Sequence, residues 1–91
     1  MANVIITLKI MPQSPETDLS KIEESAKKKI SEYEGEVGKS EQIPVAFGLK
    51  SLNITFVMDE KKGSTDKLED EASDIEGVQS VEVIDVRRAV G

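Results

Sequence analysis

The order of hydrophobic periodicities along the chain restricts the possible folds more than any other feature of the sequence. Four segments, residues 4–11, 36–46, 49–58 and 78–88, show the alternation typical of β-strands. Between them lie two segments with apolar residues three and four positions apart, which is typical of helices. The order strand, helix, strand, strand, helix, strand, joined by right-handed crossovers, predicts a ferredoxin-like α+β sandwich of βαββαβ order. We therefore expect a four-stranded antiparallel sheet with two helices on one face.

The first and third predicted strands are expected in the centre of this sheet. Each has one fully apolar face, which runs from Val4 to Ile10 and from Leu52 to Met58, and a second face that is partly apolar. Pro44 indicates an edge position for the second strand, because proline cannot donate a hydrogen bond to a neighbour. Strict alternation in the last strand predicts two pairs of side chains on opposite faces: Val81 with Val83, and Ile84 with Val86.

Polar capping residues indicate where the two helices begin, and glycines indicate where they end. The candidate N-caps are Thr17 or Asp18 for the first helix and Ser64, Thr65 or Asp66 for the second. Gly35 and Gly77 are expected to end the helices, since glycine readily adopts the left-handed conformation that follows a helix. Lysines late in the first helix and carboxylates throughout the second predict charged outer surfaces.

Composition excludes several classes of function. A chain of 91 residues predicts a single domain, residues 1–91, and its net charge of −6 disfavours binding to nucleic-acid phosphates. The acidity either suits a basic protein partner or simply keeps the domain in solution, and composition alone favours the second. The sequence has no cysteine and no histidine, which excludes disulfides, thiolate nucleophiles, imidazole bases and the usual zinc ligands. No basic region leads into a long apolar run near the start, so we expect a cytoplasmic protein without membrane contact.

No motif for covalent chemistry is visible. The phosphate-binding pattern Gly-x-x-x-x-Gly-Lys-Ser/Thr is absent, so the chain is not expected to hydrolyse nucleotides. Asp59, Glu60 and Asp66 lack the spacing of a calcium loop, and two lysines interrupt them. Nearly all of the other carboxylates fall on predicted helix surfaces or loops. We expect no enzymatic activity, no metal and no cofactor.

Two short segments contain residues suited to contact with a partner. Phe47 and Gly48 lie where two predicted strands join, and a large aromatic side chain at such a turn either folds back into the core or is presented to a partner. Arg87 and Arg88 stand near the end of an acidic chain, where they are either solvated or serve as a basic finger for a carboxylate or phosphate. The residues alone leave both alternatives open.

The sequence resembles the elongation factor 1-beta family over almost its whole length. The most specific matches are residues 16–24, 43–50 and 78–80, together with Thr65-Asp66 at the start of the second helix. The resemblance is to the short, archaeal-type form, because the chain has no room for the additional N-terminal regions of eukaryotic members. It implies guanine nucleotide exchange on elongation factor 1-alpha, a GTPase of translation, with no ligand of its own and no direct contact with nucleic acid.

The resemblance also implies roles for individual residues. The hairpin aromatic that meets the GTPase in this family falls on Phe47, with Gly48 beside it. Eukaryotic members insert a near-terminal lysine beside the magnesium and γ-phosphate site of the GTPase. A gap-free alignment through residues 78–80 brings Arg88 to that position, although arginine replaces lysine and three residues follow it. Arg87 is the alternative. The tryptophan of many eukaryotic members is absent near Val37.

Two other functions remain as alternatives. The same fold serves small-molecule regulatory domains, which bind an effector between the domains of a dimer. It also serves RNA-recognition domains, which stack bases on aromatic residues of the two central strands. Here the first strand has no aromatic residue, and Phe56 in the third is expected on the core face, so RNA binding is disfavoured.

Overall fold

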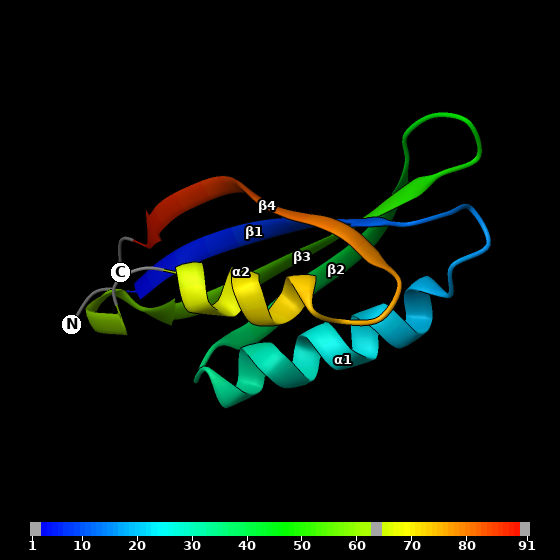
Figure 1. The fold of residues 1–91 in the computed structure, drawn as a ribbon. Coiled ribbons are helices and arrows are strands. Elements are labelled where there is room, and N and C mark those ends of the chain that lie inside the picture. The colour runs from blue at the N-terminus through cyan, green and yellow to red at the C-terminus, as the bar shows by residue number, and fades with distance from the viewer. Residues whose placement is uncertain (1–2, 63–64, 90–91) are drawn as a thin grey trace.

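The computed structural model of the chain describes residues 3–62 and 65–89, and its elements follow one another in the predicted order (Figure 1). The strands are β1 (Asn3–Pro12), β2 (Glu36–Pro44), β3 (Lys50–Asp59) and β4 (Val78–Ala89), and the helices are α1 (Leu19–Glu32), α2 (Asp66–Ser73) and the single 3-10 turn Glu60–Lys62. The strands form one antiparallel sheet in the order β2-β3-β1-β4. This confirms the ferredoxin-like α+β fold, with the first and third strands in the centre and β2 at an edge.

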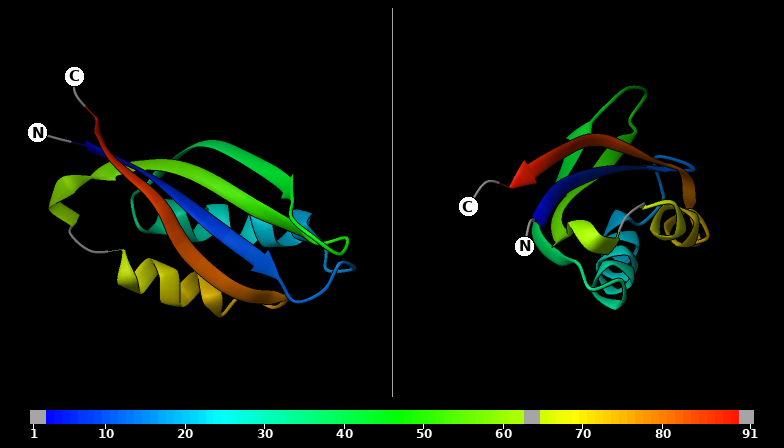
Figure 2. Two further views of the ribbon diagram at one scale, coloured as in Figure 1. Left: turned by 90° about the horizontal axis from the view of Figure 1, so that it is seen from above. Right: turned by 90° about the vertical axis from the view of Figure 1, so that its left-hand side faces the viewer.

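Both helices cover the same face of the sheet, and the core lies between these two layers (Figures 1 and 2). Alternate residues of the central strands point into it, as their apolar faces predict. Burial of each such side chain contributes about 1.5–3 kcal/mol, so this layer supplies most of the stability. The core consists mainly of Ile6, Leu8 and Ile10 from β1, Leu52, Ile54, Phe56 and Met58 from β3, Leu19, Ile22, Ala26 and Ile30 from α1, and Leu68 from α2.

The two helices begin in different ways. Asp18 is the N-cap of α1, and its carboxylate accepts a hydrogen bond of 3.0 Å from the N–H of Ser20. Thr65 is the N-cap of α2, but its hydroxyl donates to the carboxylate of Glu69 at 2.9 Å and caps no backbone group. The third candidate cap, Ser64, lies outside the described residues.

The structure corrects the predicted roles of two glycines at the helix ends. After α1 it is Glu34 that adopts the left-handed conformation, with a φ of 64°. Gly35 still takes part in the end of the helix, since its N–H donates to the carbonyl of Ile30 at 2.8 Å, and it is also needed for close packing, because a Cβ there would approach the Cγ2 of Ile30 to 2.7 Å. Helix α2 ends at Ser73, and Gly77, with a φ of 93°, forms the later turn into β4. A Cβ on Gly77 would lie 2.9 Å from the Cγ2 of Thr17, so that turn also needs glycine.

A β-bulge in β4 corrects the predicted alternation of that strand. The register pairs Val83 with Leu8 and Val86 with Ile6, and it shifts between Thr7 and Leu8. Directly paired residues point to the same face, so Val86 shares the helix-covered side with Val83. The prediction that placed Val86 on the other face is wrong because a bulge inserts an extra residue and restarts the alternation.

Candidate functional site

The turn between β2 and β3 presents the aromatic side chain that the sequence analysis singled out. The N–H of Leu49 donates to the carbonyl of Ala46 at 2.9 Å, which closes a two-residue turn. Its central residues, Phe47 and Gly48, have φ values of 53° and 79°. Positive φ at both positions is typical of a type I′ turn, whose twist matches that of the flanking strands. A second bond of 2.9 Å, from the N–H of Val45 to the carbonyl of Leu49, holds the base of the turn.

Phe47 is in an unusual state for a phenylalanine. It is 95% exposed, and it occupies a turn position that normally takes asparagine, aspartate or glycine. A positive φ costs a bulky residue of order 1–3 kcal/mol, and this phenylalanine gains no burial in return. Val45, at 50% exposure, and Ile43, near the end of β2, add further exposed apolar surface before the turn. The hairpin tip is therefore an exposed apolar projection.

At Gly48 the tip lies close to the loop between β1 and α1. The position of its missing Cβ is 3.7 Å from the Cβ of Pro15, an ordinary contact distance. A hollow of about 250 Å³ separates the two loops, with Pro15, Gly48 and Lys50 among the residues around it. The base of the tip is thus supported by this loop, while Phe47 extends beyond it.

The two arginines near the end of β4 point to opposite sides of the sheet. Arg87 pairs in the register with Ile5 and Arg88 pairs with Val4, so successive positions face opposite ways. The Nε of Arg87 lies 2.9 Å from a carboxylate oxygen of Asp85. Arg88 contacts the carboxylate of Glu60, in the 3-10 turn after β3. The side chains of Arg87 and Arg88 are 75% and 66% exposed, and exposed ion pairs are worth only about 0–1 kcal/mol, so a partner can displace these contacts at little cost.

The predicted contact residues form two separate regions. The turn between β2 and β3 lies at one end of the sheet, and the start of β1 and the end of β4 lie at the other (Figure 2). Arg88 pairs with Val4, and Val4 pairs with Met58, so Arg88 and Met58 lie at the same height along the strands. The hairpin turn joins β3 at Lys50, the other end of that strand. At about 3.3 Å per residue, these two heights are about 26 Å apart. Phe47 is therefore brought together with Gly48, but not with Arg87 or Arg88.

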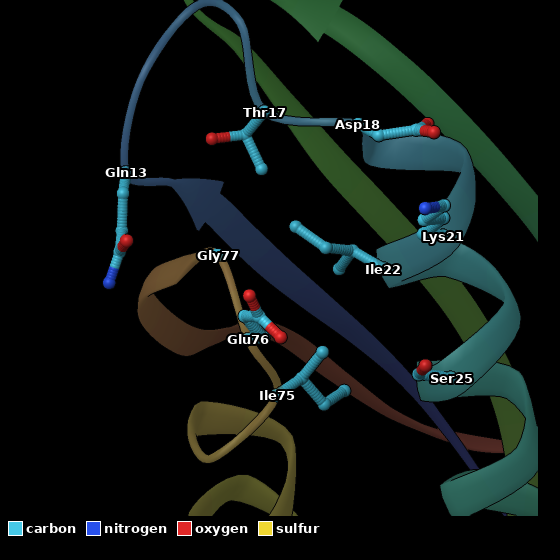
Figure 3. Close-up of a pocket in the computed structure, with 9 residues that line it drawn as sticks. All are labelled: Gln13, Thr17, Asp18, Lys21, Ile22, Ser25, Ile75, Glu76 and Gly77. Carbon is cyan, nitrogen blue, oxygen red and sulfur yellow. The ribbon is translucent and has the colours of Figure 1, made fainter.

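A cavity that the sequence analysis did not anticipate lies between the start of α1 and the turn into β4 (Figure 3). It has a volume of about 470 Å³, with Ile22 and Ile75 among its lining and Asp18, Lys21 and Glu76 as its charged groups. Among the described residues, no buried side-chain nitrogen or oxygen lacks a hydrogen-bond partner. The cavity is therefore an open surface hollow with charges of both signs, and no polar group in it calls for a ligand.

One shifted pKa belongs to the helix layer and not to either contact region. The carboxylate of Glu23 on α1 lies 2.7 Å from the ammonium of Lys27 and accepts a hydrogen bond of 3.0 Å from the hydroxyl of Ser40 on β2. The hydrogen bond from Lys27 is the largest cause that lowers the pKa of Glu23 below its ordinary value of 4.5. Burial opposes it by raising the pKa, and the hydrogen bond from Ser40 and the charge of Lys27 lower the pKa further. This network joins α1 to the edge strand.

Comparison with known proteins identifies the family. The EF-1 guanine nucleotide exchange domain matches residues 5–89. Elongation factor 1-beta of Methanothermobacter thermautotrophicus is 41% identical over 88 residues, which cover 97% of this chain and 98% of that protein. Elongation factor 1-beta of Metallosphaera sedula is 43% identical over 89 residues, which cover 97% of each.

The fold also resembles a solved structure with little sequence similarity. The C-terminal domain of the MgtC protein from Mycobacterium tuberculosis superposes with a TM-score of 0.65 at 14% identity, covering 97% of this chain and 88% of that one. Sequence identity this low supports a similarity of fold alone, and proteins with many unrelated functions share one fold. No helix among the described residues is long and apolar enough to cross a bilayer. On the strength of the sequence matches, the chain belongs to the EF-1 guanine nucleotide exchange domain family.

Proposed function

We propose that this protein promotes the exchange of GDP for GTP on elongation factor 1-alpha during translation elongation, in the cytoplasm. Membership of the exchange domain family supports the reaction. The observation on the structure that supports a protein partner is Phe47, which is 95% exposed and held at a positive φ. The turn holds its backbone in a strained conformation while its side chain gains no burial, which is the state expected of a contact residue.

The exchange factor acts through binding and makes no covalent bond. It binds the nucleotide-free GTPase more tightly than the GDP-bound form, and by linkage it weakens nucleotide binding by the same factor. It therefore accelerates exchange in both directions, and the more abundant nucleotide, GTP, enters. Neither a metal nor a cofactor of its own is needed for this role.

Phe47 is proposed as the anchor of the complex, with Gly48 allowing the turn that presents it. Truncation of a buried aromatic anchor typically costs about 2 kcal/mol or more of binding free energy. Because the side chain is already exposed in the free protein, it requires no rearrangement before it enters a pocket of the partner. Its burial in the complex would also recover the apolar surface that is left in water here.

Arg87 and Arg88 are proposed to supply positive charge near the magnesium site of the GTPase. A cation there competes with Mg²⁺ for the phosphates and for the carboxylates that hold the ion. Alignment favours Arg88, whose contact with Glu60 must be exchanged for a contact with the partner. Arg87 points to the other face and gives up a similar pair with Asp85. Because the two arginines point to opposite faces of the sheet, we expect them to have different surroundings in the complex.

Release of a fluorescent GDP analogue from cognate elongation factor 1-alpha, followed in stopped flow, tests the function. We expect the release rate to rise with added protein and then to saturate. Absence of acceleration with an active GTPase would refute the proposal. Arg88→Ala is expected to lower the saturating rate more than the affinity, and Arg88→Lys to restore it. If deletion of residues 87–91 leaves the rate unchanged, the role of the arginines is wrong.

The alternative of a small-molecule regulatory domain makes a different prediction. It requires an effector site, for which the cavity between α1 and the turn into β4 is the available hollow (Figure 3). The exposed hairpin tip has no role in that function, whereas nucleotide exchange uses it. A stable dimer in gel filtration, combined with no effect on GDP release, would favour the regulatory domain.

A further inference from the structure

Within residues 3–62 and 65–89, no helix lies on one broad face of the sheet. Both helices lie on the other side, so the uncovered side of the four strands faces away from the core (Figures 1 and 2). We call this surface the open face. Its inner part is formed by the alternate residues of β1 and β3 that do not enter the core, and its rim is formed by residues of the edge strands β2 and β4. The inner residues are Ile5, Thr7, Lys9 and Met11 of β1 and Asn53, Thr55 and Val57 of β3.

Charge is distributed differently on the two broad surfaces of the molecule. Within residues 5–11 and 51–57, Lys9 is the one charged residue on the open face, and a hydrogen bond of 3.1 Å between the hydroxyls of Thr7 and Thr55 lies at its centre. Charges gather on the edge strands, at Lys39 and Glu41 on one side and at Glu82, Asp85 and Arg87 on the other. A centre with a single charge, inside a rim with several, fits a protein interface, whose centre is depleted of charged residues.

The outer surface of the helices has the opposite character. Its exposed positions are mostly charged, with Lys21, Glu24 and Lys28 on α1 and Asp66, Lys67 and Asp70 on α2. Charged residues are depleted from the centres of protein interfaces. Of the two broad surfaces, the open face is therefore the one suited to burial against another protein.

Both proposed contact regions adjoin the open face. The segment between β2 and β3 rises away from the helices, on the uncovered side of the sheet (Figures 1 and 2). At the opposite end, Arg87 lies on the same side because it pairs with Ile5. The open face thus extends between the hairpin tip and one of the two arginines.

The size of a stable interface requires more surface than these two regions provide. A specific interface buries about 800 Å² on each partner. That is about one-seventh of the 5781 Å² of this chain. An aromatic side chain contributes only about 150–250 Å². A partner that touches both ends of the sheet must therefore also bury surface between them.

We propose that the open face is the surface against which the GTPase partner lies, between the hairpin contact and the arginine contact. The inference rests on the proposed exchange function and adds the face of the sheet on which that partner binds. It gives Lys9, at the centre, a specific role. The ammonium of Lys9 makes no ion pair with any residue in the described part of the chain, so it is free to meet a carboxylate or carbonyl oxygen of the partner.

Charge reversal on the two surfaces tests the proposal with a matched control. Lys9→Glu and Lys28→Glu change the net charge by the same amount, but the first lies on the open face and the second on the outer surface of α1. We expect Lys9→Glu to raise the protein concentration for half-maximal GDP release about 10-fold or more, and Lys28→Glu to change it less than about 2-fold. Equal effects of the two variants would overturn the proposal, since they would reflect overall charge alone.

Chemical protection supplies a second test that does not depend on charge. The chain has no cysteine, so Lys9→Cys and Lys28→Cys each create a single thiol. Their rates of reaction with a maleimide are compared with and without nucleotide-free elongation factor 1-alpha, after each variant has been shown to fold by circular dichroism. We expect about 10-fold slower labelling at position 9 in the complex and unchanged labelling at position 28, because a buried interface excludes the reagent.

The outcomes separate the inference from the proposed function. If the GTPase binds and position 9 stays as reactive as in the free protein, the open face is the wrong surface and the exchange function stands. If no complex forms and GDP release is not accelerated, both fail. If position 9 becomes protected as the protein concentration rises without any GTPase, the face belongs to a second copy of this chain and the proposal is overturned.

Discussion

The two phenylalanines of the chain differ as much as two residues of one type can. Phe56 on β3 is 0% exposed and packs beneath the helices, whereas Phe47 at the hairpin tip is 95% exposed. Phe56 has a strand conformation that suits an aromatic residue, while Phe47 has a φ of 53° that does not. The first lies where its burial stabilises the fold. The second lies where it gains nothing from folding.

This difference separates the parts of the molecule that maintain the fold from those that are available to a partner. On the helix-covered side, apolar side chains fill a closed layer, and glycines appear where no Cβ fits. At the hairpin tip and on the open face, apolar and hydroxyl side chains remain in contact with solvent. Exposed apolar surface of this kind contributes to stability only when another molecule covers it.

The largest expected effect is that of removing Phe56. Phe56→Ala leaves a cavity in the centre of the core, and such substitutions cost about 3–5 kcal/mol of unfolding free energy. For a domain of this size that is a large part of the total stability. Urea unfolding followed by circular dichroism measures the loss. A loss below about 1 kcal/mol would contradict the conclusion that Phe56, unlike Phe47, stabilises the fold.

Removal of Phe47 is expected to act on binding and not on folding. Phe47→Ala should raise the concentration for half-maximal GDP release roughly 30-fold, which corresponds to about 2 kcal/mol. Its unfolding free energy should change by less than about 0.5 kcal/mol. Phe47→Asn sharpens the comparison, because asparagine tolerates a positive φ better than phenylalanine. We expect it to unfold at a higher urea concentration than the wild type and to exchange as poorly as Phe47→Ala. Exchange at the wild-type rate by either variant would show that the tip is not the anchor.

The difference between the packed side of the molecule and the hairpin tip can also be measured by replacing one glycine in each region with alanine. Gly77 and Gly48 both have positive φ, but an added Cβ would meet Thr17 at 2.9 Å in the first case and only Pro15 at 3.7 Å in the second. Gly77→Ala should therefore cost about 2 kcal/mol of stability, from backbone strain and a clash together, and Gly48→Ala about 1 kcal/mol, from strain alone. Urea midpoints measured side by side give the difference. Equal losses would mean that the turn into β4 is no more tightly packed than the hairpin.

The smallest expected effect concerns the charged network that links α1 to β2. The folded-state pKa of Glu23 is lowered, so its ionised form stabilises the fold at pH values above 4.5, and this contribution is lost as the pH falls through the lower folded value. Glu23→Gln should reduce the unfolding free energy by about 0.5 kcal/mol at pH 7. The difference from the wild type should disappear in acid. Urea unfolding at pH 7 and at acidic pH tests this, and a difference that persists in acid would exclude the carboxylate as its cause.

Sequence patterns predicted most of the fold because local periodicity and topology agreed. The apolar face of β3 identified Phe56 as a core residue, and the core position of Leu52 and Ile54 followed from the same alternation. The patterns failed where one residue departs from regular geometry. The bulge that moves Val86 leaves no signal in hydrophobicity, and Gly77 resembles a helix stop although it serves a turn. Pairing with β1 determines the face to which Val86 points, and the closeness of Thr17 explains why the turn needs glycine at position 77.

The candidate site was predictable only in part, for a related reason. The sequence marked Phe47, Gly48, Arg87 and Arg88 by type and by resemblance, but it did not fix the exposure of Phe47 or the side to which each arginine points. It also gave no indication of the contact between Arg88 and Glu60, which are far apart in the chain. The open face was present in the alternation of β1 and β3, yet its significance depends on which surface the helices leave uncovered.

The sequence by itself determined the element order, the two central strands, the apolar layer and the family. These depend on periodicity and on local residue chemistry, which each segment carries without reference to the others. Only the tertiary structure decided that the hairpin tip and the arginines lie at opposite ends of one sheet, and that an uncovered face extends between them (Figure 2). Strand order and register place residues from distant parts of the chain side by side, and no local pattern contains that information.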